Sequence, residues 1–171
     1  MTKGYIFETA NASVSELLRA YRAILAELKR RGVVRTLNAP TGDLAELLVA
    51  RAFRGELAPN SEKSFDVIVP GGRLLQVKSR MLASGVRRER QLSTIRSWGF
   101  THLVIVLFGP DFSVTRAALM SAEVAREQSM EDRHVRGNRI MATDALLNDE
   151  RVEEITDLIV SALEGLDVDY A

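Results

Sequence analysis

The chain has 171 residues, of which 46% are hydrophobic and 27% charged, a composition typical of one folded domain rather than of a disordered chain. It contains no cysteine, which excludes disulfides, cysteine-based zinc sites and a thiol nucleophile. Any catalytic metal must therefore be held by oxygen ligands or by the two histidines. No apolar run approaches the roughly 20 residues of a membrane span, and the start of the chain lacks the apolar region of a signal peptide, so we expect a cytoplasmic protein.

The formal net charge is zero, but charge is distributed unevenly along the chain. Residues 73–96 include seven basic residues and one acidic residue, a balance of +6. Residues 141–171 include nine acidic residues and one basic residue, a balance of −8. The middle of the chain, and not its C-terminal part, is therefore expected to face nucleic-acid phosphate.

Two helices are predicted in the first third of the chain. Ser13 and Glu16 form a capping-box pattern at the start of an amphipathic helix that Gly32 ends. Residues 41–43 (Thr-Gly-Asp) are a second start signal, followed by leucines at helical spacing as far as Gly55. The first helix is expected to be an N-terminal extension and the second to begin the core.

The middle of the chain alternates between strand and helix patterns. Residues 65–69 and 74–78 read as strands, and the Pro-Gly-Gly sequence between them predicts a hairpin. A helix is predicted at residues 87–98, with Leu92 and Ile95 apolar. Residues 102–108 are apolar on both faces, a pattern typical of a central strand covered on both sides.

The last third predicts a strand at residues 112–120, a short helix capped by Ser121 and a short strand at residues 139–141. A closing amphipathic helix follows at residues 152–163, and Gly165 is expected to end it. This order predicts the α/β class, with a central mixed sheet flanked by helices. We expect one domain over residues 1–171, made of an N-terminal helix extension (1–40), a core (41–120) and a C-terminal helical portion (121–171).

Three predicted elements each contribute polar residues of the types that bind a hard metal ion. The second helix carries Glu46, the first hairpin strand carries Asp66, and the second carries Gln76, Val77 and Lys78 in succession. The segment GDLAELLVARAF followed by SFDVIVPGGRLLQVKSR resembles the metal-binding core of the PD-(D/E)XK nucleases, which have a helix acid, a strand Asp and an acid-x-Lys tripeptide in this order. The resemblance covers about forty residues and departs from the commonest pattern at Gln76, where glutamine variants also occur.

The resemblance implies a restriction endonuclease-like core and a Mg²⁺ cofactor, with Mn²⁺ as the alternative. It makes Asp66 the principal ligand, beside the Gln76 side-chain oxygen and the Val77 carbonyl, with Glu46 binding through water or holding a second ion. Lys78 would orient or deprotonate the attacking water. Because an amide carries no charge, we expect Gln76 to weaken the metal site.

The hairpin provides a geometric test of this interpretation. A strict two-residue loop at Gly71-Gly72 would pair Asp66 with Val77 and place Asp66 on the wrong face of the sheet. The nuclease interpretation therefore requires a bulge or an odd-length loop. A loop at residues 71–73 would bring Asp66 opposite Lys78.

Each candidate residue also has a structural explanation. Asp43 and Glu46 are spaced like a helix-capping pair, Gln76 would suit a solvated strand face, and Lys78 would suit an edge strand. Asp66 is disfavoured within a strand unless it is exposed or at an edge.

The interpretation names DNA as the partner and Arg80, Arg87, Arg88 and Arg90 as candidate contacts to its backbone. The short chain favours a homodimer, with the first helix as a candidate surface, and neither a membrane nor a disulfide partner is expected. We therefore predict a metal-dependent DNA endonuclease of the restriction or repair type. The alternatives are a catalytically weak nuclease-fold module for DNA binding or assembly, and an α/β interaction protein in which Asp66 and Lys78 form a surface ion pair.

Overall fold

The computed structural model describes residues 9–83, 87–132, 134 and 136–169, without the side chains of residues 87, 88, 167 and 169. The chain divides into two compact units, residues 1–40 and residues 41–171. The prediction of a single domain over the whole chain stays a prediction. None of the helices in the described ranges has the length and apolarity that a membrane span requires.

The first unit contains helix α1 (Val14–Arg30), and its boundaries follow from local chemistry. At the start, Ser13 and Glu16 form the predicted capping box, in which each side chain bonds the other residue's backbone N–H. At the end, Gly32 has a φ of 74°, its N–H donates to Lys29 O, and Val33 N–H donates to Leu28 O. This pair of bonds satisfies the last carbonyls of the helix, so the predicted stop at Gly32 is confirmed.

The second unit is built on a mixed six-stranded sheet in the order β1-β2-β3-β4-β5-β8. Strands β3 and β4 are parallel and the other neighbours are antiparallel. The α/β class with a mixed sheet is therefore confirmed. The strands are β1 (Glu56–Leu57), β2 (Val67–Val69), β3 (Arg73–Met81), β4 (His102–Phe108), β5 (Val114–Ser121) and β8 (Glu153–Glu154).

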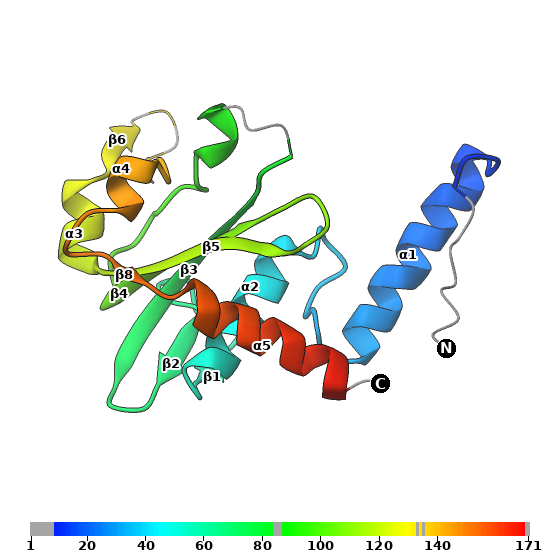
Figure 1. Ribbon diagram of the computed structural model, residues 1–171, viewed down its shortest axis with the longest axis horizontal. Helices are drawn as coiled ribbons and strands as arrows, with labels where there is room; N and C mark the ends of the chain where they lie inside the picture. The colour runs from blue at the N-terminus through cyan, green and yellow to red at the C-terminus, as the bar shows by residue number, and fades with distance from the viewer. Residues whose placement is uncertain (1–8, 84–86, 133, 135, 170–171) are drawn as a thin grey trace. The chain divides into compact units, whose positions relative to one another are not determined.

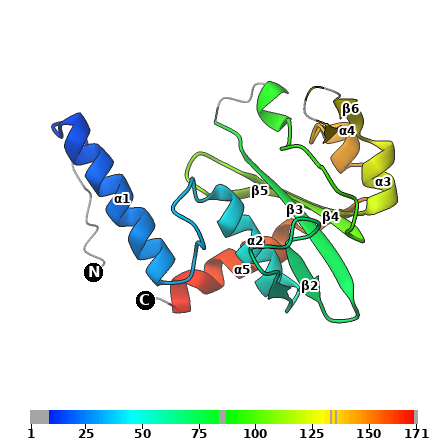
Figure 2. The same ribbon diagram turned by 180° about the vertical axis from the view of Figure 1, so that it is seen from behind.

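Helices cover both faces of this sheet (Figures 1 and 2). Helices α2 (Thr41–Ala52) and α5 (Thr156–Asp169) pack against each other, α2 against β3 and α5 against β5. On the other face lie α3 (Ala122–Glu127), α4 (Asp144–Leu147) and the 3-10 helix η1 (Arg87–Arg90). Strand β4 lies in the middle and is buried from Leu103 to Phe108, which explains why its sequence is apolar on both faces.

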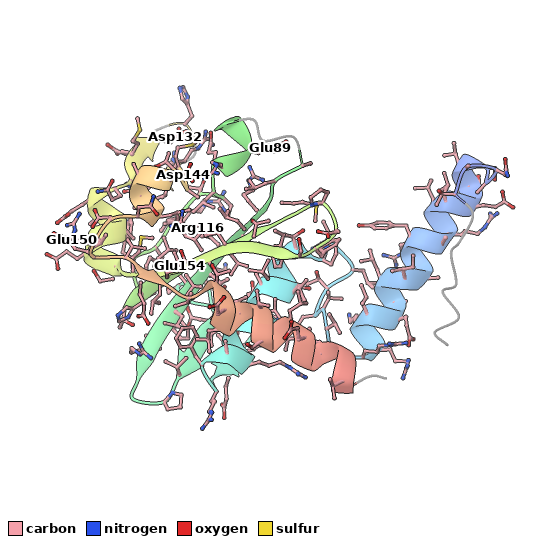
Figure 3. All side chains as sticks on the ribbon, viewed as in Figure 1. Glu89, Arg116, Asp132, Asp144, Glu150 and Glu154 are labelled. Atoms are coloured by element: carbon pink, nitrogen blue, oxygen red, sulfur yellow. The ribbon has the colours of Figure 1, made fainter. Side chains whose placement is uncertain are left out.

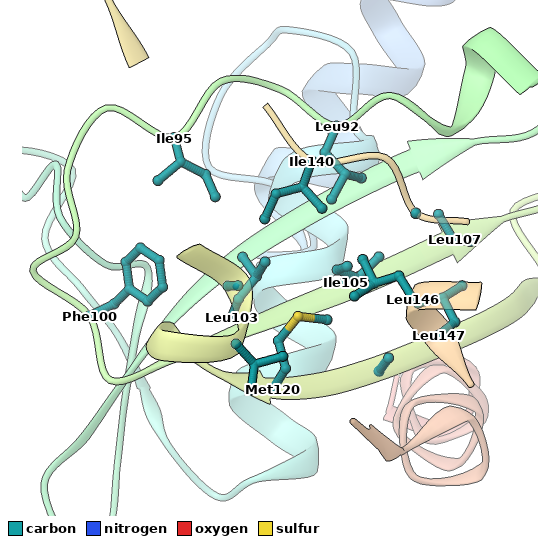
Figure 4. Packing of buried hydrophobic residues seen from close by; sticks show 14 residues of the cluster. Leu92, Ile95, Phe100, Leu103, Ile105, Leu107, Met120, Ile140, Leu146 and Leu147 are labelled. Atoms are coloured by element: carbon teal, nitrogen blue, oxygen red, sulfur yellow. The ribbon is translucent and has the colours of Figure 1, made fainter. Parts of the chain in front are cut away.

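A continuous apolar cluster fills the space between the sheet and α3, α4 and the segment that follows η1 (Figure 4). Leu103 and Ile105 of β4 and Met120 of β5 form its floor, and each is at most 1% exposed. Leu92 and Ile95 cover it from above, both 2% exposed. This packing holds the segment between β3 and β4 against the face of the sheet that carries Gln76 and Lys78.

Two sequence predictions about helices were wrong. Residues 87–98 are not one helix: only η1 is helical, and the chain then forms isolated bridges from Gln91 to Met141 and from Ile95 to Asn138. Helix α5 does not end at Gly165 but continues to Asp169, because Leu166 is buried at 5% exposure and holds the last turns in place.

The remaining predictions agree with the structure to within a few residues, although short elements were missed. Helix α2, the β2–β3 hairpin, β4, β5 and the Ser121 cap of α3 are all present. The predicted strand at residues 139–141 corresponds to β7 (Gly137–Arg139), which pairs with β6 (Met130–Asp132). The elements β1, β6, α4 and β8 have two to four residues each and were not predicted.

Candidate active site

The β2–β3 hairpin has an odd-length loop, as the nuclease interpretation requires. Val69 pairs with Arg73, so the loop consists of Pro70, Gly71 and Gly72. Both glycines have positive φ values, 88° and 80°, which residues with a Cβ rarely adopt. The loop is one residue earlier than the loop at residues 71–73 that we expected.

This loop changes the predicted partner of Asp66 but keeps it on the required face. Continuing the register of Val67 with Leu75 by one residue places Asp66 opposite Gln76, not opposite Lys78. Asp66 N–H nevertheless donates to Leu75 O at 2.8 Å, a one-residue irregularity just before β2. Both Gln76 and Lys78 lie on the same face of β3, because side chains two residues apart share a face.

Asp66 occupies the point at which the β2–β3 ladder ends. Its Oδ2 accepts the Val77 backbone N–H at 2.7 Å, in place of the carbonyl that a longer β2 would supply. The same oxygen accepts a hydrogen bond from the Gln76 side-chain amide. Asp66 is half-buried, and these two hydrogen bonds hold its carboxylate. Its position at the end of the ladder explains how an Asp is tolerated beside a strand.

Gln76 is the only buried polar or charged side chain among the residues that the structure describes, at 8% exposure. This burial contradicts the alternative that Gln76 lies on a solvated strand face. A buried amide needs a partner, and Asp66 supplies it. Its nitrogen faces Asp66, so the Gln76 oxygen would face the same position after the amide turns by 180°.

Lys78 follows on the same face, in a strand that lies between β2 and β4. Among the described residues, β3 pairs only with β4 at Lys78, because the pairing with β2 ends at Leu75, so the alternative that Lys78 protects a sheet edge stays a prediction. Burial lowers the pKa of the Lys78 ammonium below its ordinary value, the charges of Asp66 and Glu46 raise it, and the charge of Arg96 lowers it. The net direction is downward, and the charges of Asp66 and Glu46 are close enough to act on Lys78.

Glu46, on helix α2, acts on this site through its charge, although α2 covers the face of the sheet opposite to Gln76 and Lys78. The helix begins at Thr41, so Asp43 lies inside its first turn and does not cap it, which removes the capping explanation for Glu46. Glu46 is half-buried and acts electrostatically on Lys78. The start of α2 is attached to β3, because the Ser79 hydroxyl donates to Thr41 O at 3.2 Å.

Two of the predicted DNA contacts form bonds within the protein. Arg80 is exposed on the Lys78 face of β3, and its Nε donates to Gln91 O at 2.6 Å. Arg90 donates to Ala142 O at 2.9 Å and to Asp144 Oδ1 at 2.8 Å; Asp144 is labelled in Figure 3. The Arg87 and Arg88 side chains lie outside the described residues.

Arg96 is a site residue that the sequence analysis did not select. It is exposed on the segment that crosses the Gln76 face, and its charge acts on Lys78. The only sequence signal was its membership in the basic stretch of residues 73–96. Its role was obscured because that segment was predicted to be a helix.

The oxygen donors of this site are two carboxylates, one amide and one backbone carbonyl. They come from Asp66, Glu46, Gln76 and Val77. Within the described ranges, no group of three or more acidic or histidine side chains could hold a metal ion. Mg²⁺ keeps several waters and needs only one or two carboxylates, so the donor set fits this ion and would bind it weakly.

No protein-family model matches the sequence. No curated protein matches it either. A function for this chain must therefore be inferred from the residues and the geometry of the site itself.

Proposed function

We propose that this protein is a metal-dependent endonuclease that hydrolyses DNA phosphodiester bonds. The observation that carries the proposal is the contact of Asp66 with Gln76, with Lys78 two residues further along the same face of β3. Four elements agree with a restriction endonuclease-like core: a helix with Glu46, the two strands of the Asp66 hairpin, and a central strand parallel to β3. The resemblance in sequence and this arrangement both support the proposal.

Each residue has a role that follows from its surroundings. Mg²⁺ would be held by Asp66, the Gln76 oxygen and the Val77 carbonyl, with Glu46 contributing directly or through water. When bound, the ion would stabilise the developing negative charge and lower the pKa of a bound water. Lys78 would orient that water and accept its proton, and burial supports this role because it lowers the pKa of the Lys78 ammonium.

The second candidate function is a nuclease-fold module that binds DNA or a partner subunit with little or no hydrolysis. Gln76 favours this candidate, because an amide replaces the carboxylate of the commonest family pattern and removes one negative charge from the metal site. The buried position of Gln76 makes the loss of charge more important than at an exposed site. A homodimer, a cytoplasmic location and a restriction or repair role stay predictions.

The test compares wild type with Lys78→Ala and with Lys63→Ala on supercoiled DNA. Lys63 is an exposed lysine of the loop before Asp66 and therefore controls for loss of a positive charge. Reactions contain Mg²⁺, Mn²⁺ or EDTA, and nicked and linear products are quantified. We expect nicking that requires the metal, is lost in Lys78→Ala and is retained in Lys63→Ala.

The same samples distinguish the alternatives. Metal binding measured by calorimetry on wild type and Asp66→Asn shows whether Asp66 is a ligand even if cleavage is slow. DNA binding that weakens with salt, without cleavage by any variant, would favour the nuclease-fold module. Equal cleavage by wild type and Lys78→Ala would contradict the proposed site, and a parallel RNA substrate tests the preference for DNA.

A further inference from the structure

We infer that a cleft formed by the β6–β7 hairpin and the segment after η1, apart from the Asp66–Lys78 site, binds a nucleobase; its link to DNA cleavage rests on the proposed function. The cleft has a volume of about 580 Å³, within the usual range for small-molecule sites. The residues that line it include Gln91, Gln128, Met130, Met141 and Leu146. None of these residues belongs to the Asp66–Lys78 site.

The polar groups of the cleft suit a neutral ring with donor and acceptor edges. Gln91 and Gln128 each present a primary amide, which can donate and accept side by side and so match the edge of a base. Within the described part of the chain, neither amide makes a side-chain hydrogen bond, and the Glu131 carboxylate makes none either. These groups are therefore available to a ligand.

The apolar groups of the cleft suit the flat face of such a ring. Met130 lines the cleft and is 74% exposed, so its side chain is accessible to a ligand. Met141 and Leu146 contribute apolar surface in the wall. Methionine is flexible and packs favourably against aromatic rings, which suits a site that receives one.

The charge of the lining argues against a phosphate in the same place. Glu131 and Asp132 contribute two negative charges, and Arg139 contributes one positive charge. Arg139 is already paired with Asp132 at 2.9 Å, on the hairpin where Figure 3 labels Asp132. An anion would therefore meet a net negative lining, whereas a base would not be repelled.

The position of the cleft connects it to the proposed cleavage site. Arg80 lies two residues beyond Lys78 on the same face of β3, a step of about 7 Å along a strand. Arg80 bonds the carbonyl of Gln91, which lines the cleft. A nucleotide strand with a phosphate at Lys78 would thus have a neighbouring base within reach of Gln91. The base could come from such a strand, turned out of its stack, or from a free nucleoside.

Methionine methyl NMR tests this inference without requiring cleavage. The full chain is labelled with ¹³C at the methionine methyls, which report on Met130 and Met141 in the cleft and on Met81 and Met120 outside it. Nucleosides, ribose 5-phosphate and short oligonucleotides are titrated separately, with Ca²⁺ replacing Mg²⁺. We expect saturable shifts of the two cleft methyls with nucleosides or oligonucleotides, and none with ribose 5-phosphate.

Variants make the result specific. The double variant Gln91→Ala, Gln128→Ala should weaken these shifts by about 10-fold or more in affinity, whereas Glu123→Ala, on α3 outside the lining, should leave them unchanged. Shifts with oligonucleotides alone assign the base to a strand, and shifts with nucleosides alone assign it to a free ligand; either supports the inference.

The inference is overturned if the cleft methyls do not respond to any base, or respond equally to ribose 5-phosphate. It stands apart from the proposed function, because Lys78→Ala can lose cleavage and keep the Met130 and Met141 shifts. If the wild type shows neither methyl shifts nor cleavage, both proposals are rejected. If it cleaves DNA without methyl shifts, only the nucleobase cleft is rejected.

Discussion

Gln76→Glu restores the carboxylate that the PD-(D/E)XK pattern has at this position and tests the proposed metal site directly. In the folded protein the new carboxylate would lie against Asp66 at 8% exposure. Two like charges about 4 Å apart repel by about 4 kcal/mol at the effective dielectric constant of such a site. Lys78 offsets part of this repulsion, and proton uptake relieves more, because a pKa rise of one unit corresponds to about 1.4 kcal/mol.

The expected net loss without metal is about 2 kcal/mol at pH 8, or a decrease of about 4–8 °C in Tm for a chain of this length. Because burial and the neighbouring Asp66 raise the pKa of the introduced carboxyl group in the folded state, the folded variant binds the extra proton more tightly than the unfolded chain does. The deficit relative to wild type should therefore be absent below pH ~4.3, the ordinary glutamate value, and should grow as pH rises to the raised pKa.

A bound divalent ion should reverse this order. At a metal concentration about 100 times Kd, binding stabilises the folded state by about 2.7 kcal/mol, which exceeds the expected deficit. Thermal melting with EDTA and with increasing Mg²⁺, at pH 5 and pH 8, measures both effects. Asn60→Asp adds the same charge at an exposed amide side chain outside both proposed sites and is the matched control. If both variants melt alike and neither gains from Mg²⁺, then Asp66 and Gln76 do not form a metal site.

Three further predictions concern the stability of the second unit. Lys78→Met should raise Tm at pH 7, because burial lowers the pKa of the Lys78 ammonium, and it should abolish cleavage. The gain in Tm should shrink as the pH rises towards the ordinary pKa of lysine. Lys63→Met, at an exposed lysine, should change neither Tm nor cleavage. Gly55→Ala should cost about 1–3 kcal/mol in denaturant unfolding, because its Cβ would lie 2.6 Å from Ile68 O. Gly165→Ala should instead stabilise by up to about 1 kcal/mol, since no atom of the described residues, apart from chain neighbours and the backbone of α5 itself, lies within 4 Å of its Cβ. A lower midpoint would contradict this reasoning.

Local chemistry in the sequence was sufficient for elements with strong signals. Ser13, Glu16 and Gly32 specify both ends of α1 through bonds between neighbouring residues, so no tertiary contact is needed to predict them. The unbroken apolar run of β4 is long enough to identify a strand buried on both faces. Asp66 and Gln76 lie on the two strands of one hairpin, so their order along the chain was sufficient to predict that their side chains meet. The place of Glu46 and Lys78 in one metal site stays a prediction.

Tertiary structure decided what short or ambiguous patterns could not. Leu92 and Ile95 have a spacing that suits a helix, but the same two side chains are buried by an extended segment that bridges to residues 138–141. Strands of two or three residues have no period to detect, and Gly165 stays helical because Leu166 is buried beyond it. The proposed site depends on the same distinction. The sequence supplied the residue types of the site. The three-residue loop that begins at Pro70 and the irregular step at Asp66 decided that Asp66 faces Gln76, because a shift of one residue moves a side chain to the other face of the sheet.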